Sequence, residues 1–293
     1  MLSAFCFAGS HVASKRGLQD TSVIAASLIV LSVSWVVIVI SVVLDPPAEV
    51  TGKAVAVYSG LGLIVPAISR WSVLRSVDML GPSIAIPIQQ GLRPLLAVGG
   101  AVLLLGESLD LLRLVGVLAI VAGGWQLSRR PREANGDHAG SAVVAADGRW
   151  ALRRGIVFPF IAAIAYAASD LLVRLTVGGD LAEPGFAAMV STGAGLAAWL
   201  VIVGTVRSVR AGVRLGPRAW WLVLAGVLIG FAILAVYNAL RRGEVSVVTP
   251  INAVQPLLVL LLSSLLLRDL EQIRPVTVVS GVAIVIGVIL VSV

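Results

Sequence analysis

The sequence contains few charged residues and only one cysteine. Charged residues make up 13% of the 293 positions, whereas about 25% is typical of a soluble domain, and 58% of the positions are hydrophobic. Mean hydropathy is +1.02. This composition excludes an ordinary soluble domain and predicts a polytopic membrane protein. The single cysteine, Cys6, excludes an internal disulfide and any cysteine-based metal cluster.

Motifs for nucleotide, metal or nucleophile chemistry are also missing. The sequence has no GxxxxGK[ST] loop, so it does not hold ATP in the manner of a P-loop protein. Its two histidines, His11 and His138, lie in unrelated segments and predict no metal site. No Ser-His-Asp arrangement can be argued. We therefore expect a protein that is not an enzyme and carries no cofactor or metal.

The basic residues lie mainly between apolar runs. The formal net charge is +7, which could suggest nucleic acid as a partner. Because most arginines occupy the segments between hydrophobic stretches, membrane topology explains them better. We expect the partners to be the lipid bilayer and a small-molecule substrate, with no nucleic acid.

Ten apolar runs predict ten helical spans. A helix needs about 20 apolar residues to cross the hydrocarbon core of a membrane. The runs fall at about 1–15, 22–44, 53–77, 82–105, 111–127, 155–177, 184–206, 219–240, 245–267 and 275–291. The first is short, and its repeat counterpart begins near Gly155, which would map before Met1. We therefore expect the first helix to lack residues at its start.

The chain contains a long internal duplication. When Pro94 is set over Pro256, an offset of 162 residues, the segment LLLGE ending at Glu107 falls on LLLRD ending at Asp269. The starts of the two halves match at an offset of 159, with FAGSHVASK from Phe7 lying over YAASDLLVR from Tyr166. Repeats of this kind define the architecture before any local interpretation. The halves are residues 1–128 and 155–293, joined by a polar linker at 129–154.

The duplicated unit, with its AL..G.VS...PI...PLL....LLL.(D/E) signature, resembles the EamA-type branch of the drug/metabolite transporter superfamily. The resemblance covers nearly the whole chain and is strongest in residues 237–293. It implies an all-α integral membrane fold with about ten transmembrane helices, arranged as two inverted five-helix repeats with a substrate cavity between them. It does not name the substrate.

The charge distribution also predicts an orientation. The linker at 129–154 holds the densest arginine cluster, and the positive-inside rule places it in the cytoplasm. With ten spans, both termini would then face outward. Proteins of the family that the chain resembles have both termini inside, so the two arguments disagree. We expect a multi-pass protein of the cell membrane, either a monomer or a homodimer.

Asp170 is the only acid deep inside a predicted span, and His11 is its repeat counterpart. An ionisable group in the bilayer is costly and marks an ion or substrate pathway by default. We therefore assign ion coupling, with the proton as the ion, to both residues. The competing interpretations are a structural hydrogen bond for Asp170 and a wet interfacial position for His11.

Arg93 lies near the middle of the fourth span. Gln89 and Gln90 precede it by four and three residues, so all three share one helical face. We expect this face to line the cavity opposite Asn252 and Gln255 of the other half. Arg93 could bind an anionic substrate group or form an internal ion pair with Asp170, and the sequence leaves both open.

Four further residues are candidates for the cavity wall. Arg70 lies late in the third span, Tyr166 one turn before Asp170, and Tyr237 and Asn238 late in the eighth span. Core packing is the competing role for the two tyrosines. The acids Glu107 and Asp269 are interpreted as structural caps of the helices that follow them.

These patterns predict a secondary transporter of a small polar metabolite, working by alternating access around a central site. Export is expected by analogy with the family, and proton coupling because Asp170 is the deep acid. The alternatives are a lipid-carrier flippase of the same fold, an intramembrane lipid enzyme, and a scaffold without a transport cycle. A single deep acid argues against the enzyme.

Overall fold

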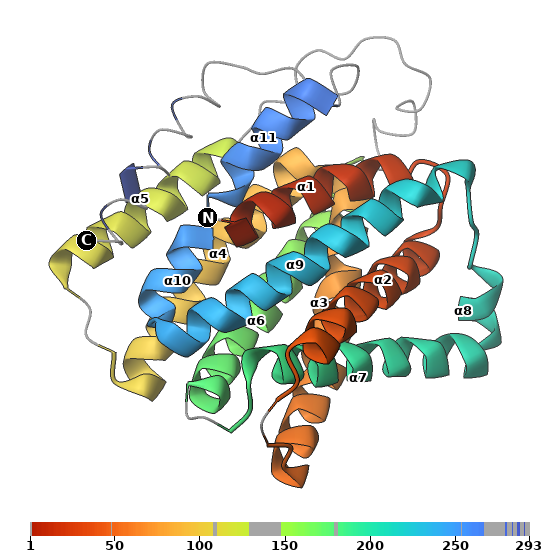
Figure 1. Ribbon diagram of the computed structural model, residues 1–293. Helices are drawn as coiled ribbons and strands as arrows, with labels where there is room; N and C mark the ends of the chain where they lie inside the picture. Colours follow the sequence, from red (N-terminus) through yellow and green to blue (C-terminus); the bar gives the residue numbers. More distant parts are fainter. Residues whose placement is uncertain are drawn as a thin grey trace.

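The computed structural model describes residues 2–47, 49–107, 110–128, 148–178, 181–252 and 254–266, with five single positions after residue 278. The regular structure of these residues is helical (Figure 1). In chain order the elements are α1 (Leu2–Gly17), α2 (Val23–Leu44), α3 (Gly52–Leu80), α4 (Pro82–Gly100), the π-helical turn η1 (Ala101–Leu105), α5 (Leu111–Ser128), α6 (Gly148–Val177), α7 (Pro184–Thr205), α8 (Arg207–Ala211), the 3₁₀ turn η2 (Pro217–Ala219), α9 (Trp220–Arg242), α10 (Val245–Asn252) and α11 (Gln255–Leu266).

The expected all-helical membrane fold is confirmed at this coarse level. Within the described ranges, six helical stretches are long and apolar enough to cross a membrane: Val23–Leu44, Gly52–Leu80, Ile88–Leu105, Gly155–Val177, Pro184–Thr205 and Pro217–Arg242. The last expected span, at 275–291, lies almost entirely outside the described residues. The number of ten spans and the inverted relation of the repeats therefore stay predictions.

The differences from the expected helices include three that affect α6, α3 and the predicted ninth span. Helix α6 begins at Gly148, seven residues before the predicted start, and α3 continues to Leu80, three residues past its predicted end. At Gly81, φ is +78°, a backbone conformation that suits glycine and separates α3 from α4. The third difference is in the predicted ninth span, which is divided into α10 and α11.

The division between α10 and α11 lies next to a proline. In a continuous helix the N–H of residue 256 would donate to the carbonyl of Asn252, but Pro256 has no N–H. Helix α10 ends at Asn252 and α11 begins at Gln255. The freed Asn252 carbonyl accepts a hydrogen bond from Gln90 Nε2 at 3.4 Å. Helix α4 runs through the equivalent Pro94 without interruption, so of these two proline positions only the one in the second half lies at a break.

The main helix contacts join the two halves of the chain. Helix α1 packs against α9 and α11, α2 against α7 and α9, α3 against α6 and α7, and α4 against α6. In Figure 1, α1, α9 and α2 lie side by side as three near-parallel helices. The contacts of α1 with α9 and of α6 with α3 are equivalent under the duplication. The core therefore lies between the halves.

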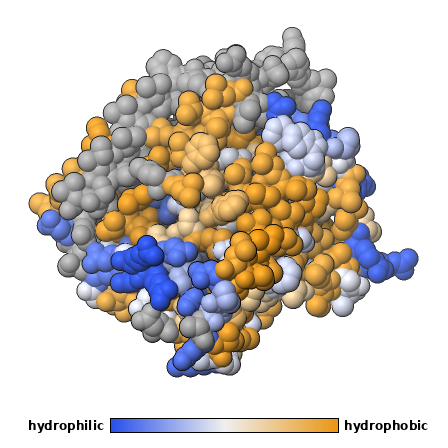
Figure 2. Space-filling view, viewed as in Figure 1, coloured by the Kyte–Doolittle hydropathy of each residue, from blue (hydrophilic) through white to orange (hydrophobic). Residues whose placement is uncertain are grey.

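Small residues bring some of these helices very close. A Cβ built on Gly62 of α3 would lie 2.0 Å from the carbonyl oxygen of Ser191 in α7, so a side chain does not fit between these backbones. Outside the core, many large apolar side chains are exposed, such as Leu200 and Val201 on α7. Figure 2 shows apolar side chains covering much of one face, as expected for a surface that meets lipid.

Candidate functional site

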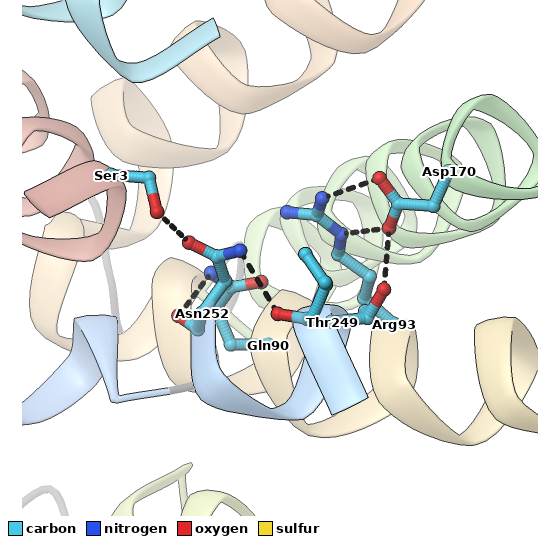
Figure 3. A network of polar contacts seen from close by, with 7 residues as sticks. Ser3, Gln90, Arg93, Asp170, Thr249 and Asn252 are labelled. Carbon is cyan, nitrogen blue, oxygen red and sulfur yellow. Dashed lines mark hydrogen bonds and ion pairs between the residues drawn. The ribbon is translucent and has the colours of Figure 1, made fainter. Parts of the chain in front are cut away.

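An ion pair joins α4 to α6 in the interior (Figure 3). Arg93 Nε donates to Asp170 Oδ2 at 2.9 Å, and Arg93 Nη2 donates to Asp170 Oδ1 at 2.8 Å. Both side chains are only 4% exposed. Two parallel hydrogen bonds of this kind hold a guanidinium and a carboxylate in one plane and neutralise both charges. Arg93 and Asp170 therefore connect the first half of the chain with the second.

Two more residues complete the surroundings of the pair. Thr249 of α10 donates from Oγ1 to Asp170 Oδ2 at 3.1 Å. The guanidinium carbon of Arg93 lies 5.1 Å from the centre of the Tyr166 ring, a distance at which a cation is attracted to the ring face. The Asp170 carboxylate thus accepts three hydrogen bonds, so its burial is well compensated.

Arg70 on α3 is equally buried but poorly compensated. It is 3% exposed, and it lies ten residues before the end of α3, about 15 Å along the axis at ~1.5 Å per residue. Arg70 Nη2 donates to Ser14 Oγ at 3.3 Å and to Ser10 Oγ at 3.4 Å. Its Nε and Nη1 have no partner of standard hydrogen-bond geometry, although the side chain of Tyr166 lies close enough for a weaker polar contact with the guanidinium. A guanidinium in the bilayer interior costs about 2.5–3.5 kcal/mol on the insertion scale.

His11 lies beside Arg70 and Gln255, in the interior. It is 3% exposed, so the alternative of a wet interfacial histidine is wrong. The reason is tertiary packing: although α1 is short, α3, α9 and α11 all pack against it. The Nδ1 atom of His11 has no hydrogen-bond partner among the described residues. Its expected part in ion coupling stays a prediction.

A central cavity lies between the two halves. Helices α1 to α4 of the first half and α6, α7 and α9 of the second contribute to its wall. About 70 Å³ is open to the centres of water molecules, room for a few waters or one polar group. Its polar lining includes the expected Arg70, Arg93, Tyr166, Asp170 and Tyr237, together with Ser69, Ser169, Ser191 and Thr192.

The other predicted residues lie elsewhere. Ser3 Oγ of α1 donates to Asn252 Oδ1 at 2.6 Å, and Gln90 contacts the Asn252 carbonyl, so a second polar group surrounds the break between α10 and α11 (Figure 3). Gln89 and Gln255 are 3% and 2% exposed, and both keep an unpaired amide atom among the described residues. The α4 face meets Asn252 through Gln90, but none of these four amide side chains lines the cavity where they were expected.

Asn238 does not belong to the site. It is exposed, and its Nδ2 donates to the carbonyl of Leu234 in its own helix at 2.9 Å. Tyr237, one position earlier, points inward and forms a 3.0 Å hydrogen bond with Ser191. Successive residues on a helix point about 100° apart, and the rotation of α9 that turns Tyr237 inward leaves Asn238 exposed.

The role expected of Glu107 also needs correction. Its two carboxylate oxygens accept hydrogen bonds from the backbone N–H groups of Val245 and Ser246, at 3.1 and 3.0 Å. These groups open α10, in the other half of the chain. Glu107 therefore caps a distant helix and not the one that follows it. Asp269 lies outside the described residues.

Sequence reasoning missed two residues that complete the site. Thr249 precedes Asn252 by three positions and so shares its face of α10, a signal that could have identified it. Ser191 bonds the carbonyl of Ala188 in its own helix and also the buried Tyr237 of α9. Nothing in the sequence pairs Ser191 with Tyr237, because 46 residues separate them.

Comparison with known proteins agrees with the fold and the membrane location. The model of the EamA-like transporter family matches residues 1–128 and 153–293, nearly all of the chain. No curated protein shows significant sequence similarity to it. A solved structure described only as a crystal structure of a protein is similar with a TM-score of 0.70 and 16% identity, over 99% of this chain and 93% of the other. At this identity the likeness concerns the fold alone.

Proposed function

The chain belongs to the EamA-like transporter family, a group of membrane transporters, and on this premise we propose that it carries a small polar metabolite by alternating access through the central cavity. One observation above all supports this proposal: a cavity walled by helices of both halves, with the ion pair between Arg93 of α4 and Asp170 of α6 among the groups that line it. A site shared by two halves can be exposed to either side of the membrane when the halves rock against each other.

The ion pair suggests how the cycle is controlled. While Asp170 is ionised, Arg93 and Thr249 hold it from the first half and from α10. A proton on Asp170 removes the negative charge and weakens both hydrogen bonds to Arg93, because charge-assisted bonds are roughly twice as strong as neutral ones. The helices α4 and α6 would then be free to separate. Asp170 is thus the proposed proton-coupling residue. Export is the proposed direction, by analogy with the family.

The break between α10 and α11 offers a point of movement. The Asn252 carbonyl is bonded to the Gln90 side chain and not to a helical N–H group. Irregular backbone at membrane depth is tolerated where protein groups satisfy it, and broken helices of this kind accompany binding sites in transporters. Gln90 and Asn252 would then hold α10 against α4 in one state of the cycle.

The test is transport in proteoliposomes. Vesicles that contain the purified protein are given a pH gradient, and the accumulation of solutes from a labelled metabolite mixture is measured by mass spectrometry. We expect the parent protein to drive uphill movement of at least one solute, and Asp170→Asn to lose the uphill component while retaining exchange. The control is Asp45→Asn, because Asp45 is an exposed acid at the end of α2. Parental uphill transport by Asp170→Asn would contradict proton coupling through this residue.

A further inference from the structure

We propose that Arg70 receives an anionic group of the transported molecule, a carboxylate or a phosphate, at the wall of the central cavity. This inference rests on the proposed transport function and adds the chemical class of the substrate. It also transfers the expected anion-binding role from Arg93 to a different residue.

The first reason is that Arg70 keeps donors free. A guanidinium has five N–H donors. The two hydroxyls of Ser10 and Ser14 accept only from Nη2, and the Nε–H and the two Nη1–H groups have no acceptor of standard hydrogen-bond geometry. The nearby Tyr166 side chain offers only a weaker polar contact and carries no compensating charge. Within the described part of the chain, no carboxylate pairs with Arg70. An anion in the cavity would supply both the missing acceptors and the missing charge.

The second reason is the charge balance of the cavity wall. Arg93 and Asp170 cancel each other through their two hydrogen bonds. Arg70 then leaves the wall with one uncompensated positive charge, in a place where water contributes little screening. A neutral or cationic substrate would not remove this imbalance, whereas a monoanion would.

The third reason is a second donor beside the first. The hydroxyl of Ser69 is 1% exposed, lines the same cavity, and has no hydrogen-bond partner among the described residues. A carboxylate or phosphate has several acceptor positions and can use both Arg70 and Ser69. The tyrosine Tyr166, which lies close to Arg70 and Arg93, bounds this part of the wall.

The fourth reason is that the duplicated scaffold does not require the charge. The offset of 162 residues, carried back without a gap from Gly81 over Gly243, places Arg70 over Ala232. Ala232 is fully buried in α9, so the equivalent position of the second half is apolar. The positive charge of Arg70 departs from the internal symmetry of the two halves. The duplicated fold does not need this charge, which favours a role in binding a ligand.

The remaining wall indicates the shape of the molecule. Apart from the polar residues named above, the cavity is lined by apolar side chains: Phe7, Leu31, Val173, Ile229, Ile233, Val236 and Leu240. The open space is small, so the polar end is limited to one compact group. The best match is a small monoanion with an apolar body.

The experiment measures anion binding by thermal unfolding of the full-length protein in neutral detergent at constant ionic strength. The probes are inorganic phosphate and isobutyrate, with isobutyramide as a neutral molecule of the same shape. We expect phosphate or isobutyrate, but not isobutyramide, to raise the unfolding temperature of the parent protein, since ligands stabilise the state that binds them. Arg70→Gln should weaken anion binding about 10- to 100-fold, and Arg70→Lys less, because lysine keeps the charge without the planar fork.

Three results would overturn the proposal: an equal response to isobutyramide, an unchanged anion affinity in Arg70→Gln, or no response of the parent protein to either anion. If Arg70→Gln does not fold, Arg70→Lys and Ser69→Ala decide, and unchanged anion affinity in both counts against the site. Repeating the measurement in bilayers of phosphatidylcholine with and without phosphatidylglycerol separates a free anion from a lipid headgroup. An Arg70-dependent effect of the anionic lipid alone would support the anion site with the lipid as its source.

Transport measurements separate failure of this inference from failure of the proposed function. If proteoliposomes move a neutral or cationic solute and Arg70→Gln moves it equally well, the anion site is wrong and the transporter remains. If anions bind in an Arg70-dependent way but no solute crosses the membrane, the anion site remains and the alternating-access proposal is wrong.

Discussion

Two buried arginines line the same cavity, and their surroundings differ. Arg93 on α4 has a bidentate carboxylate partner and an aromatic ring beside it. Arg70 on α3 has two serine hydroxyls at 3.3 and 3.4 Å, and two of its nitrogens lack a hydrogen bond of standard geometry. Because burial removes water from both, only the first is fully compensated within the protein. The difference teaches that depth alone does not identify a ligand-binding charge, and that the partners of the charge must be counted.

We expect the largest loss of stability when one member of the Arg93–Asp170 ion pair is removed. Arg93→Gln leaves the Asp170 carboxylate buried without its cation, and Asp170→Asn leaves the guanidinium without its anion. Each single change should reduce stability by about 3–5 kcal/mol, the usual cost of removing one member of a buried pair. The double variant should recover much of this loss. Thermal unfolding of the four proteins in detergent gives the coupling energy, and simple additivity of the two losses would show that the pair is not formed.

We expect smaller losses of stability when the hydroxyl groups that contact the ion pair or Arg70 are removed. Thr249→Val removes a donor to the charged Asp170 at nearly constant volume, and should cost about 1.5–3 kcal/mol. Ser14→Ala removes one of two long contacts to Arg70, and should cost about 0.5–1.5 kcal/mol because Ser10 remains. Both are measured as changes in unfolding temperature. A larger loss for Ser14→Ala would mean that the serines, and not a ligand, are the main partners of Arg70.

A third change displaces the helix that carries Arg70. Gly62→Ala would place a methyl group 2.0 Å from the Ser191 carbonyl oxygen, so α3 and α7 must separate. We expect a loss of about 1–3 kcal/mol, as for an overpacked core. Gly60→Ala is the matched control, because a Cβ there meets no atom within 4 Å. Equal unfolding temperatures for the two variants would contradict the close contact of α3 with α7.

Much of the fold could be predicted because the position and length of each apolar run indicate where a membrane-spanning helix begins and ends. The expected limits of the runs at 22–44 and 184–206 agree with α2 and α7 to within one residue at each end. The start of α6 was missed because the positively charged Arg153 and Arg154 look like a loop, although a helix can extend beyond the membrane. The break at Asn252 could not be located from Pro256 alone, since the equivalent Pro94 leaves α4 intact.

The site was only partly predictable, because side-chain direction depends on packing. A pairing of Arg93 with Asp170 could be anticipated, since a deep acid and a deep base each need a partner. The choice between Tyr237 and Asn238 could not be made, because the sequence does not fix the rotation of α9 about its axis. The depth of Arg70 was underestimated, since three further residues of α3 follow the expected end of the span.

The most direct test of the central comparison is the unfolding temperature of Arg93→Gln and Arg70→Gln, measured side by side without added ligand in the same detergent. Our interpretation predicts that Arg93→Gln unfolds at a clearly lower temperature than the parent protein. Arg70→Gln should unfold at the same or a higher temperature, because it removes a buried charge that lacks a counter-ion. An equally large decrease for Arg70→Gln would contradict the account and make Arg70 a structural residue.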